Sequence, residues 1–191
     1  IGQSIGKILL ESKWVSVLHG LDICDKNAAK FIFPSFHIAP KVTEAEYIDF
    51  IRNYVKLHEI DLVIPIAEPE LRQYSLKGWD AQIIGAKVLI ANQKALAVGF
   101  DKMATVKFLA DHGFTHPVTR LISNAEKDLQ LPVIFKSRTG SGSKSILLVK
   151  DFESYNFYLD LYKGEDFIIQ EFISGDEGEY TCGLFRASSG E

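Results

Sequence analysis

Cysteine is scarce in this sequence: only Cys24 and Cys182 occur among its 191 residues. The two lie far apart in apolar surroundings, so we expect both to be buried, without the disulfide framework of a small secreted protein. Long apolar runs are missing too, and none approaches the roughly 18 residues that a membrane-spanning helix requires. No signal peptide is recognisable. These absences favour a cytoplasmic protein with no membrane partner.

An excess of charge of one sign is also missing. The chain has 21 basic and 25 acidic residues, a net charge of −4, and the two signs are interspersed. This balance argues against a nucleic-acid partner. Hydrophobic residues make up 47% of the chain, which suffices for one large domain or two small ones. The chain begins at Ile1 rather than Met and ends in a turn-like Ser-Ser-Gly-Glu, so we expect a part of a longer protein.

Residues 1–92 predict an α/β domain with a parallel sheet, because strand and helix patterns alternate along them. The helix over residues 43–57 is expected to begin with a capping box, in which Thr43 is the N-cap and Glu46 follows three residues on. A glycine turn opens an earlier helix near Gly2, without the strand that would normally precede it. Strands are expected over three segments, 14–18, 30–34 and 61–65.

Residues 93–191 predict an α+β domain whose closing strands are antiparallel. Asp101 is suited to cap a helix over residues 102–112, and Gly113 is suited to end it. A strand begins at Pro132 and leads into a loop. The later elements are expected to be strands at 146–150, 167–172 and 179–185, with a helix at 152–162.

The loop after Pro132 carries the first candidate chemistry. Its strand ends at Lys136, and Arg138 and Lys144 add positive charge to the small residues that follow. Glycines let the backbone approach a ligand, and successive N–H groups with serine hydroxyls form a nest for an anion. A flexible hairpin with solvated lysines has the same composition, so the loop alone leaves both interpretations open. The small residues of this candidate cradle are Gly140, Ser141, Gly142 and Ser143.

A second candidate segment begins with the strand that ends near Phe172. The edge of such a strand can offer backbone groups to a purine, and a carboxylate such as Glu179 can accept the hydroxyls of a ribose. An ordinary acidic turn is the alternative. At the start of the predicted helix, Asp101 and Lys102 are equally compatible with a plain cap beside a solvated lysine.

Taken in order and spacing, these segments resemble the ATP-grasp family. The resemblance covers nearly the whole chain, although Ser137 stands where the family often has proline. The strand at 61–65 and the Glu68-Pro69-Glu70-Leu71 turn are similar to the domain that precedes the grasp, and the closest branch is that of the carbamoyl phosphate synthetase large subunit. The matching motifs of the second domain are Asp101-Lys102, Pro117-Val118-Thr119, Lys136, the glycine-serine loop, Gln170-Glu171 and Gly178-Glu179-Tyr180-Thr181.

The resemblance implies a Rossmann-like pre-ATP-grasp domain over residues 1–92 and the first part of an ATP-grasp domain over residues 93–191. It also implies a ligand set for ATP. Lys102 and Lys136 would hold the phosphates, and residues 140–143 would fold over them. Gln170, Glu171, Phe172 and Ile173 would meet the adenine, and Glu179 would bind the ribose.

The activity implied is that of a ligase, which uses ATP to activate a small carboxylate as an acylphosphate for attack by an amine or thiol. Cations and Mg²⁺ must then offset the charge on the transferred phosphoryl group. The family's Mg²⁺ ligands lie in a later segment, so we expect them beyond Glu191 and expect the 191 residues alone to be inactive. The alternative is a non-catalytic nucleotide-binding or regulatory module of the same fold. A homodimer stays open, and no catalytic residue or metal ligand is identified.

Overall fold

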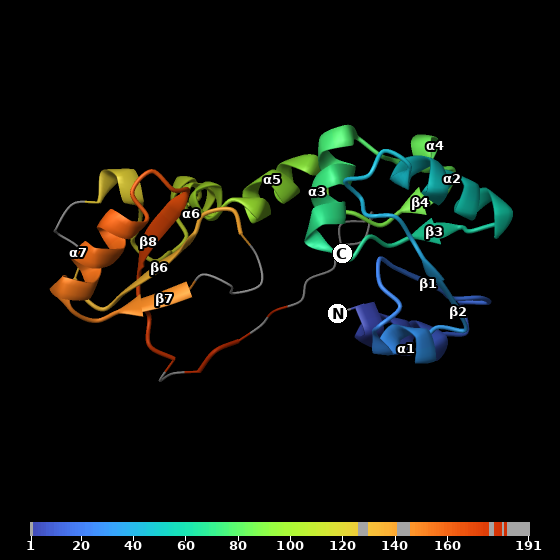
Figure 1. The fold of residues 1–191 in the computed structure, drawn as a ribbon, viewed down its shortest axis with the longest axis horizontal. Helices are drawn as coiled ribbons and strands as arrows, with labels where there is room; N and C mark the ends of the chain where they lie inside the picture. Colours follow the sequence, from blue (N-terminus) through green and yellow to red (C-terminus); the bar gives the residue numbers. More distant parts are fainter. Residues whose placement is uncertain (1, 126–129, 141–145, 176–177, 181, 183–191) are drawn as a thin grey trace. The chain divides into compact units, whose positions relative to one another are not determined.

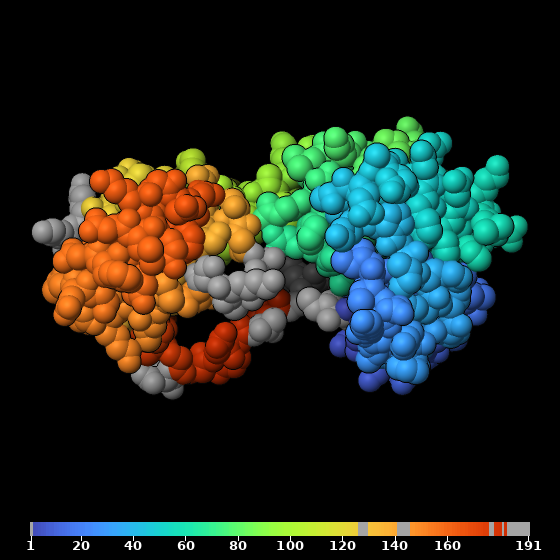
Figure 2. All heavy atoms as spheres, in the orientation of Figure 1, coloured from blue at the N-terminus to red at the C-terminus, as the bar shows by residue number. Residues whose placement is uncertain are grey.

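The computed structural model describes residues 2–125, 130–140, 146–175, 178–180 and residue 182. The chain divides into two units, unit 1 with residues 1–100 and unit 2 with residues 101–191 (Figure 1). In the space-filling view, unit 1 runs from blue to green and unit 2 from olive to orange-red (Figure 2). Helix α5, Gln93–Phe100, belongs to unit 1, although residues 93–191 were expected to form the second domain.

Unit 1 is built from short strands that alternate with helices. Its strands form two pairs, β1 with β2 and β3 with β4, and both pairs are parallel, as the α/β pattern predicted. Besides α5, its elements are α1 (Gly2–Leu10), β1 (His19–Asp22), the 3₁₀ helix η1 (Ala28–Phe31), β2 (Ser35–Ile38), α2 (Tyr47–Leu57), β3 (Leu62–Val63), α3 (Glu68–Lys77), α4 (Ala81–Ile84) and β4 (Lys87–Val88).

The core of unit 1 forms around one face of α2. Tyr47, Ile51 and Val55 are buried at helical spacing and pack with residues of the other elements such as Ile84, as the apolar stripe predicted. The predicted start of this helix is wrong. The helix begins four residues later than expected, because Glu44 instead accepts a hydrogen bond from the backbone N–H of Lys41 (3.0 Å) and closes a separate turn.

Two predicted strands of unit 1 are also wrong. Residues 14–18 form none, and Trp14 is 85% exposed. Residues 30–34 do not form the predicted strand either. Their first two residues belong to η1, which the side chain of Asn27 caps by accepting from the N–H of Ala29 (2.8 Å). The strands begin later, at His19 and Ser35, where close packing of the Phe33 ring favours Gly20: a Cβ on Gly20 would lie 2.5 Å from Phe33 Cγ.

The two cysteines differ from expectation, since both Cys24 and Cys182 are exposed rather than buried. Cys24 lies just after the bend that ends β1, outside any helix or strand, so its apolar neighbours in the sequence did not predict its burial. Among the residues that the structure describes, no helix has both the length and the apolar character to cross a membrane.

Unit 2 contains one four-stranded sheet with the strand order β5-β8-β6-β7. Every pairing in it is antiparallel. The strand predicted over 179–185 falls mostly outside the described residues, and residues 179, 180 and 182 lie in no strand. The elements are α6 (Lys102–Asp111), β5 (Thr119–Leu121), the 3₁₀ helix η2 (Ile122–Asn124), β6 (Val133–Ser137), β7 (Ile146–Val149), α7 (Phe152–Leu161) and β8 (Phe167–Glu171).

The two faces of this sheet have different characters. On one face, Val133, Phe135 and Ile169 are fully buried and pack with Tyr155 of α7. The helix starts where Asp151 accepts a hydrogen bond from the N–H of Ser154 (2.8 Å). Because side chains alternate along a strand, the neighbours of these buried residues turn to the opposite face, which carries the polar groups.

Candidate functional site

A row of hydrogen-bonded side chains crosses three strands of the unit 2 sheet. Lys136 Nζ on β6 donates to Oε1 of Gln170 on β8 (2.6 Å). Gln170 Nε2 donates to Oγ1 of Thr119 on β5 (2.7 Å), and the Thr119 hydroxyl donates to the carbonyl of Pro117 (2.9 Å). The register accounts for the row, because Gln170 pairs directly with Thr119 and with Ile134, two residues from Lys136. We call Lys136, Gln170 and Thr119 the cross-strand row.

The environment of Lys136 disfavours its charge. Partial burial lowers the pKa of this ammonium group, and the positive charge of Lys102 lowers it further. The effect of Lys102 is notable because the two lysines come from different elements, the start of α6 and the end of β6. The fold therefore places the two lysines within range for their charges to influence each other.

Lys102 lies against the beginning of the glycine-serine loop. Its Nζ donates to the carbonyls of Gly140 (2.8 Å) and Arg138 (3.3 Å). Its backbone N–H donates to the same Arg138 carbonyl (3.2 Å). The preceding residue, Asp101, caps α6 as predicted by accepting from the N–H groups of Met103 (2.8 Å) and Ala104 (3.3 Å).

Arg138 forms an ion-pair cluster rather than presenting free charge. Its Nε and Nη2 donate to Oδ1 and Oδ2 of Asp101 (2.9 and 2.5 Å), and its Nη1 lies 3.7 Å from Oδ1 of Asp166. The Arg138 hydrogen bond is the largest cause that lowers the pKa of the Asp101 carboxyl, with helix N–H groups adding to it. Arg138 was expected to add charge around a phosphate, whereas its guanidinium group pairs with the carboxylates of Asp101 and Asp166.

Gly140 is held closely by the strand that precedes it. Its N–H donates to Oγ of Ser137 (3.1 Å), and a Cβ on Gly140 would lie only 2.9 Å from that oxygen. A larger residue at this position would require the Ser137 side chain to move. The remaining predicted cradle residues, Ser141, Gly142 and Ser143, lie outside the described residues.

Of the residues predicted to meet adenine and ribose, all of which the structure describes, Gln170 alone contacts one of the two lysines. Oε2 of Glu171 accepts from the N–H of Val118 (2.9 Å), which ties β8 to the chain before β5. The N–H of Phe172 donates to the Pro132 carbonyl (3.3 Å). Ile173 is 65% exposed, and Glu179 is exposed outside any helix or strand. The structure thus brings together Lys102 with Gly140 and Lys136 with Gln170, and leaves the other described residues apart.

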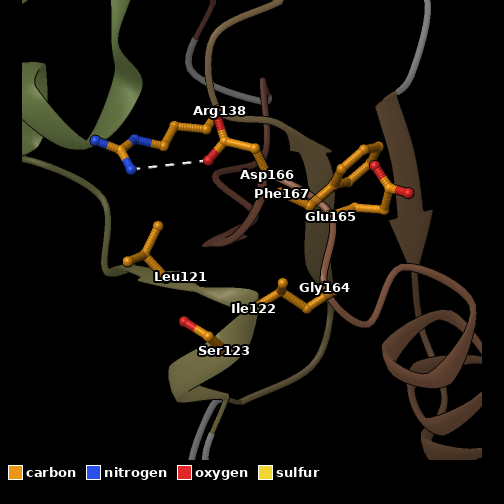
Figure 3. A pocket seen from close by; sticks show the side chains of 8 residues that line it. All are labelled: Leu121, Ile122, Ser123, Arg138, Gly164, Glu165, Asp166 and Phe167. Atoms are coloured by element: carbon orange, nitrogen blue, oxygen red, sulfur yellow. Dashed lines mark ion pairs between the residues drawn. The ribbon is translucent and has the colours of Figure 1, made fainter.

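An open cavity of about 280 Å³ lies near one end of the sheet (Figure 3). The Arg138 side chain reaches toward Asp166 at its rim. None of the predicted ATP ligands lines this cavity. Its lining residues are Leu121, Ile122, Ser123, Arg138, Gly164, Glu165, Asp166 and Phe167.

Three contributors to the site escaped the sequence analysis. Thr119 was noted only as part of a motif, although it completes the cross-strand row. Asp166 was not noted at all, and Asp101 was noted as a cap and as part of a motif but not as a partner of Arg138. Asp101 and Arg138 are 37 positions apart, so no local pattern signals their pairing. In the described part of the chain, no group of three His, Cys, Asp or Glu side chains is arranged to hold a metal ion.

Comparison with known proteins identifies the kind of domain that unit 2 contains. Residues 100–181 match an ATP-grasp domain. The ATP-grasp match spans every helix and strand of unit 2, from α6 to β8, and confirms the family resemblance for this part of the chain. No curated protein matches the sequence.

Solved structures with the same fold include a synthetase, a ligase and a carboxylase domain. An ADP complex of N5-carboxyaminoimidazole ribonucleotide synthetase is 14% identical with a TM-score of 0.68, covering 90% of this chain and 45% of that one. L-amino acid ligase from Bacillus licheniformis is 18% identical, with a TM-score of 0.54 and coverages of 74% and 34%. The biotin carboxylase domain of 2-oxoglutarate carboxylase from Hydrogenobacter thermophilus, with MgADP, ADP and bicarbonate, is 13% identical, with a TM-score of 0.64 and coverages of 91% and 42%. This chain spans less than half the length of each.

Proposed function

We propose that unit 2 binds the polyphosphate of ATP for a ligase that activates a small carboxylate as an acylphosphate, which an amine or thiol then attacks. The match of residues 100–181 to an ATP-grasp domain supports this class of reaction. So does the fold shared with a ligase and with two enzymes whose structures contain ADP.

The pair formed by Lys102 and Lys136 carries the proposal. Each ammonium group donates to neutral acceptors: the carbonyls of Arg138 and Gly140 in one case and the amide of Gln170 in the other. Among the residues that the structure describes, neither lysine forms an ion pair. Two close cations without a carboxylate attract an anion that carries several charges, and a triphosphate is such an anion.

Phosphoryl transfer gives these cations a chemical role. Negative charge spreads over the oxygens of the transferred group, and positive groups that are already in place stabilise it. In this proposal Lys102 and Lys136 hold the phosphates at the open edge of the glycine-serine loop. The family resemblance supplies the remaining proposed contacts, which are Gly140, Ser141, Gly142 and Ser143 for phosphate, Gln170, Glu171, Phe172 and Ile173 for adenine, and Glu179 for ribose.

Mg²⁺ does not fit the described residues, which offer no group of three potential ligands, so we derive no step through a metal. We propose that its ligands lie outside residues 1–191. Unit 1 is proposed to be the Rossmann-like domain that precedes an ATP-grasp, supported by its parallel strand pairs. The carbamoyl phosphate synthetase-like branch and a homodimer are proposals as well, the first supported by the sequence motifs alone.

Titration with a fluorescent ATP analogue tests the proposal. Lys136→Ala should weaken binding about 10- to 100-fold, the loss expected for a charge-assisted hydrogen bond. Lys150→Ala removes the same charge from an exposed position in unit 2 and should leave affinity unchanged. Competition by ATP but not by adenosine would assign the effect to the phosphates. Absence of ATP binding, or equal affinity in the two variants, would overturn the proposal.

A further inference from the structure

Arg138 connects the two proposed phosphate lysines through its backbone and its side chain. Its carbonyl accepts from both the backbone N–H and Nζ of Lys102 (3.2 and 3.3 Å). Its guanidinium group turns back to the preceding residue, Asp101, and binds both carboxylate oxygens. Asp101, Lys102 and Arg138 therefore form a closed ring of contacts, in which the Arg138 carbonyl holds the Lys102 ammonium group.

A second set of contacts joins Arg138 to the strand that carries Gln170. The N–H of Arg138 donates to the Asp166 carbonyl (2.9 Å), and its guanidinium group lies near the Asp166 carboxylate (3.7 Å). Asp166 immediately precedes β8, on which Gln170 accepts from Lys136. Arg138 thus fixes the beginning of β8 relative to the end of β6, where Lys136 is located.

We propose that Arg138 and Asp101 are positioning residues, whose ion pair sets the place of the Lys102 ammonium group and hence its spacing from Lys136. The ligand served is the polyphosphate of a nucleoside triphosphate, so this inference rests on the proposed function. Arg138 itself does not contact the phosphates, because its guanidinium group is occupied by Asp101 and Asp166.

The geometry favours a specific pair over a loose surface contact. The side chains of Arg138 and Asp101 are 34% and 22% exposed, and two parallel N–H···O bonds join them. Bidentate arginine–carboxylate pairs are stronger and more directional than single surface ion pairs. Asp101 also caps α6, so an effective test must separate capping from pairing.

Asp101→Asn makes that separation. Asparagine caps helices as well as aspartate does, but an amide cannot accept both bonds of the guanidinium group. Asp151→Asn is the matched control, because Asp151 caps α7 by accepting from Ser154 and the same change there touches no arginine contact. Arg138→Gln removes the other partner. Arg138→Lys keeps the charge without the fork.

The first readout is affinity for ATP and for adenosine. Asp101→Asn and Arg138→Gln should each weaken ATP binding about tenfold, the double variant no more than the worse single one, and adenosine binding should not change. The ATP affinity of Arg138→Lys should lie between those of the unaltered chain and Arg138→Gln. The ATP affinity of Asp151→Asn should equal that of the unaltered chain. Equal ATP affinity in Asp101→Asn and Asp151→Asn would overturn the inference.

The second readout needs no nucleotide. Mild acetylation followed by mass spectrometry should label Lys102 slowly relative to Lys107, whose side chain is 74% exposed. Asp101→Asn should accelerate labelling of Lys102 severalfold, whereas Asp151→Asn should not. If the chain binds no ATP yet Lys102 labelling rises, the proposed function fails and the positioning role stands. If Lys136→Ala weakens ATP binding while Asp101→Asn alters neither readout, only the positioning role fails.

Discussion

Polar side chains join neighbouring elements in both units, but the chemistry of these contacts differs between the units. In unit 1, the Tyr54 hydroxyl lies 2.8 Å from Nδ1 of both His19 and His37, and the His58 ring lies 4.3 Å from the Tyr54 ring. In unit 2, full charges are paired instead, between Arg138 and its carboxylates. The histidine cluster, which we define as His19, His37, Tyr54 and His58, holds elements together only while it is mostly neutral. The ion pairs of Arg138 with Asp101 and Asp166 hold elements of unit 2 together only while these side chains are charged.

The hydroxyl of Tyr54 explains the requirement for neutrality. A hydroxyl donates one hydrogen bond and can also accept, so at most one of the two imidazoles accepts from Tyr54 and at least one donates to it. Protonation of both His19 and His37 would turn both Nδ1 atoms into donors, so neither could accept the Tyr54 proton and two like charges would face one hydroxyl. Consistently, burial lowers the pKa of His19, and the charges of His58 and His37 lower it further.

The largest effect expected from a single change tests whether the units are independent. Phe135→Ala should destabilise unit 2 by about 3–5 kcal/mol, because it opens a cavity between β6 and the rings of α7. Both tryptophans, Trp14 and Trp79, lie in unit 1, so their fluorescence reports on unit 1 alone. In urea unfolding, the change should shift the circular dichroism transition and leave the fluorescence transition in place.

The reciprocal variant is Ile84→Ala, in the core of unit 1, which should shift the fluorescence transition. If Phe135→Ala moved the fluorescence transition equally, the units would unfold together and the comparison between them would lose its basis.

A smaller effect is expected from the cross-strand row. Gln170→Leu should cost about 1–3 kcal/mol in unit 2, because it leaves Lys136 and Thr119 without their shared partner in a half-buried place. Gln93→Leu removes an exposed amide that donates to the Ser75 carbonyl in unit 1, and should cost less than about 0.5 kcal/mol. Equal losses of unfolding free energy in the two variants, measured with urea, would mean that the cross-strand row stabilises the fold no more than an exposed hydrogen bond does.

Acidification should act on unit 1 before unit 2. The folded state lowers the pKa of His19, so stability is intact above the ordinary histidine value of 6.5 and is lost as pH falls below it. The pKa of Asp101 is also lowered, but from 3.8, so its contribution is lost only in stronger acid. Thermal melts from pH 7.5 to 4.5 should lower the midpoint of the fluorescence transition more than that of a unit 2 probe. The reverse order would contradict this prediction.

The smallest effect concerns one charge in the histidine cluster. Other charged groups on these elements are turned to separate partners: Asp22 on β1 accepts from Cys24, and Asp49 on α2 pairs with Arg52. His58→Gln should therefore raise the pKa of His19 toward its ordinary value, since a facing positive charge is removed. An NMR titration of the His19 ring measures this, and an unchanged value would show that His58 does not contribute to the shift.

Sequence was most informative where structure depends on neighbours in the chain. Asp101 and Asp151 cap helices by accepting from residues two or three positions on, and such contacts can be read locally. The strands near Trp14 and Phe33 could not be read this way, because contact between Phe33 and Gly20 decides where the chain pairs.

The same limit applies to the candidate site. Lys136 and Gly140 could be proposed as site residues because a strand, a lysine and a glycine lie within a few positions of one another. The side-chain role of Gln170 was not, since its partners Thr119 and Lys136 lie 51 and 34 positions away. Local patterns located the cations, and only the tertiary fold defines what surrounds them.

The alternation along β8 has a consequence for how this protein can fail. Gln170 and its neighbour Glu171 point to opposite faces of the sheet, and only the neutral one contacts Lys136. A slip of β8 by a single residue would exchange them and place a carboxylate beside the lysine, creating an internal substitute for the anion. Because β8 lies between β5 and β6, two neighbours oppose such a slip at once. The register of this one central strand thus keeps a negative charge away from Lys136 and leaves the polar face of the sheet positively charged.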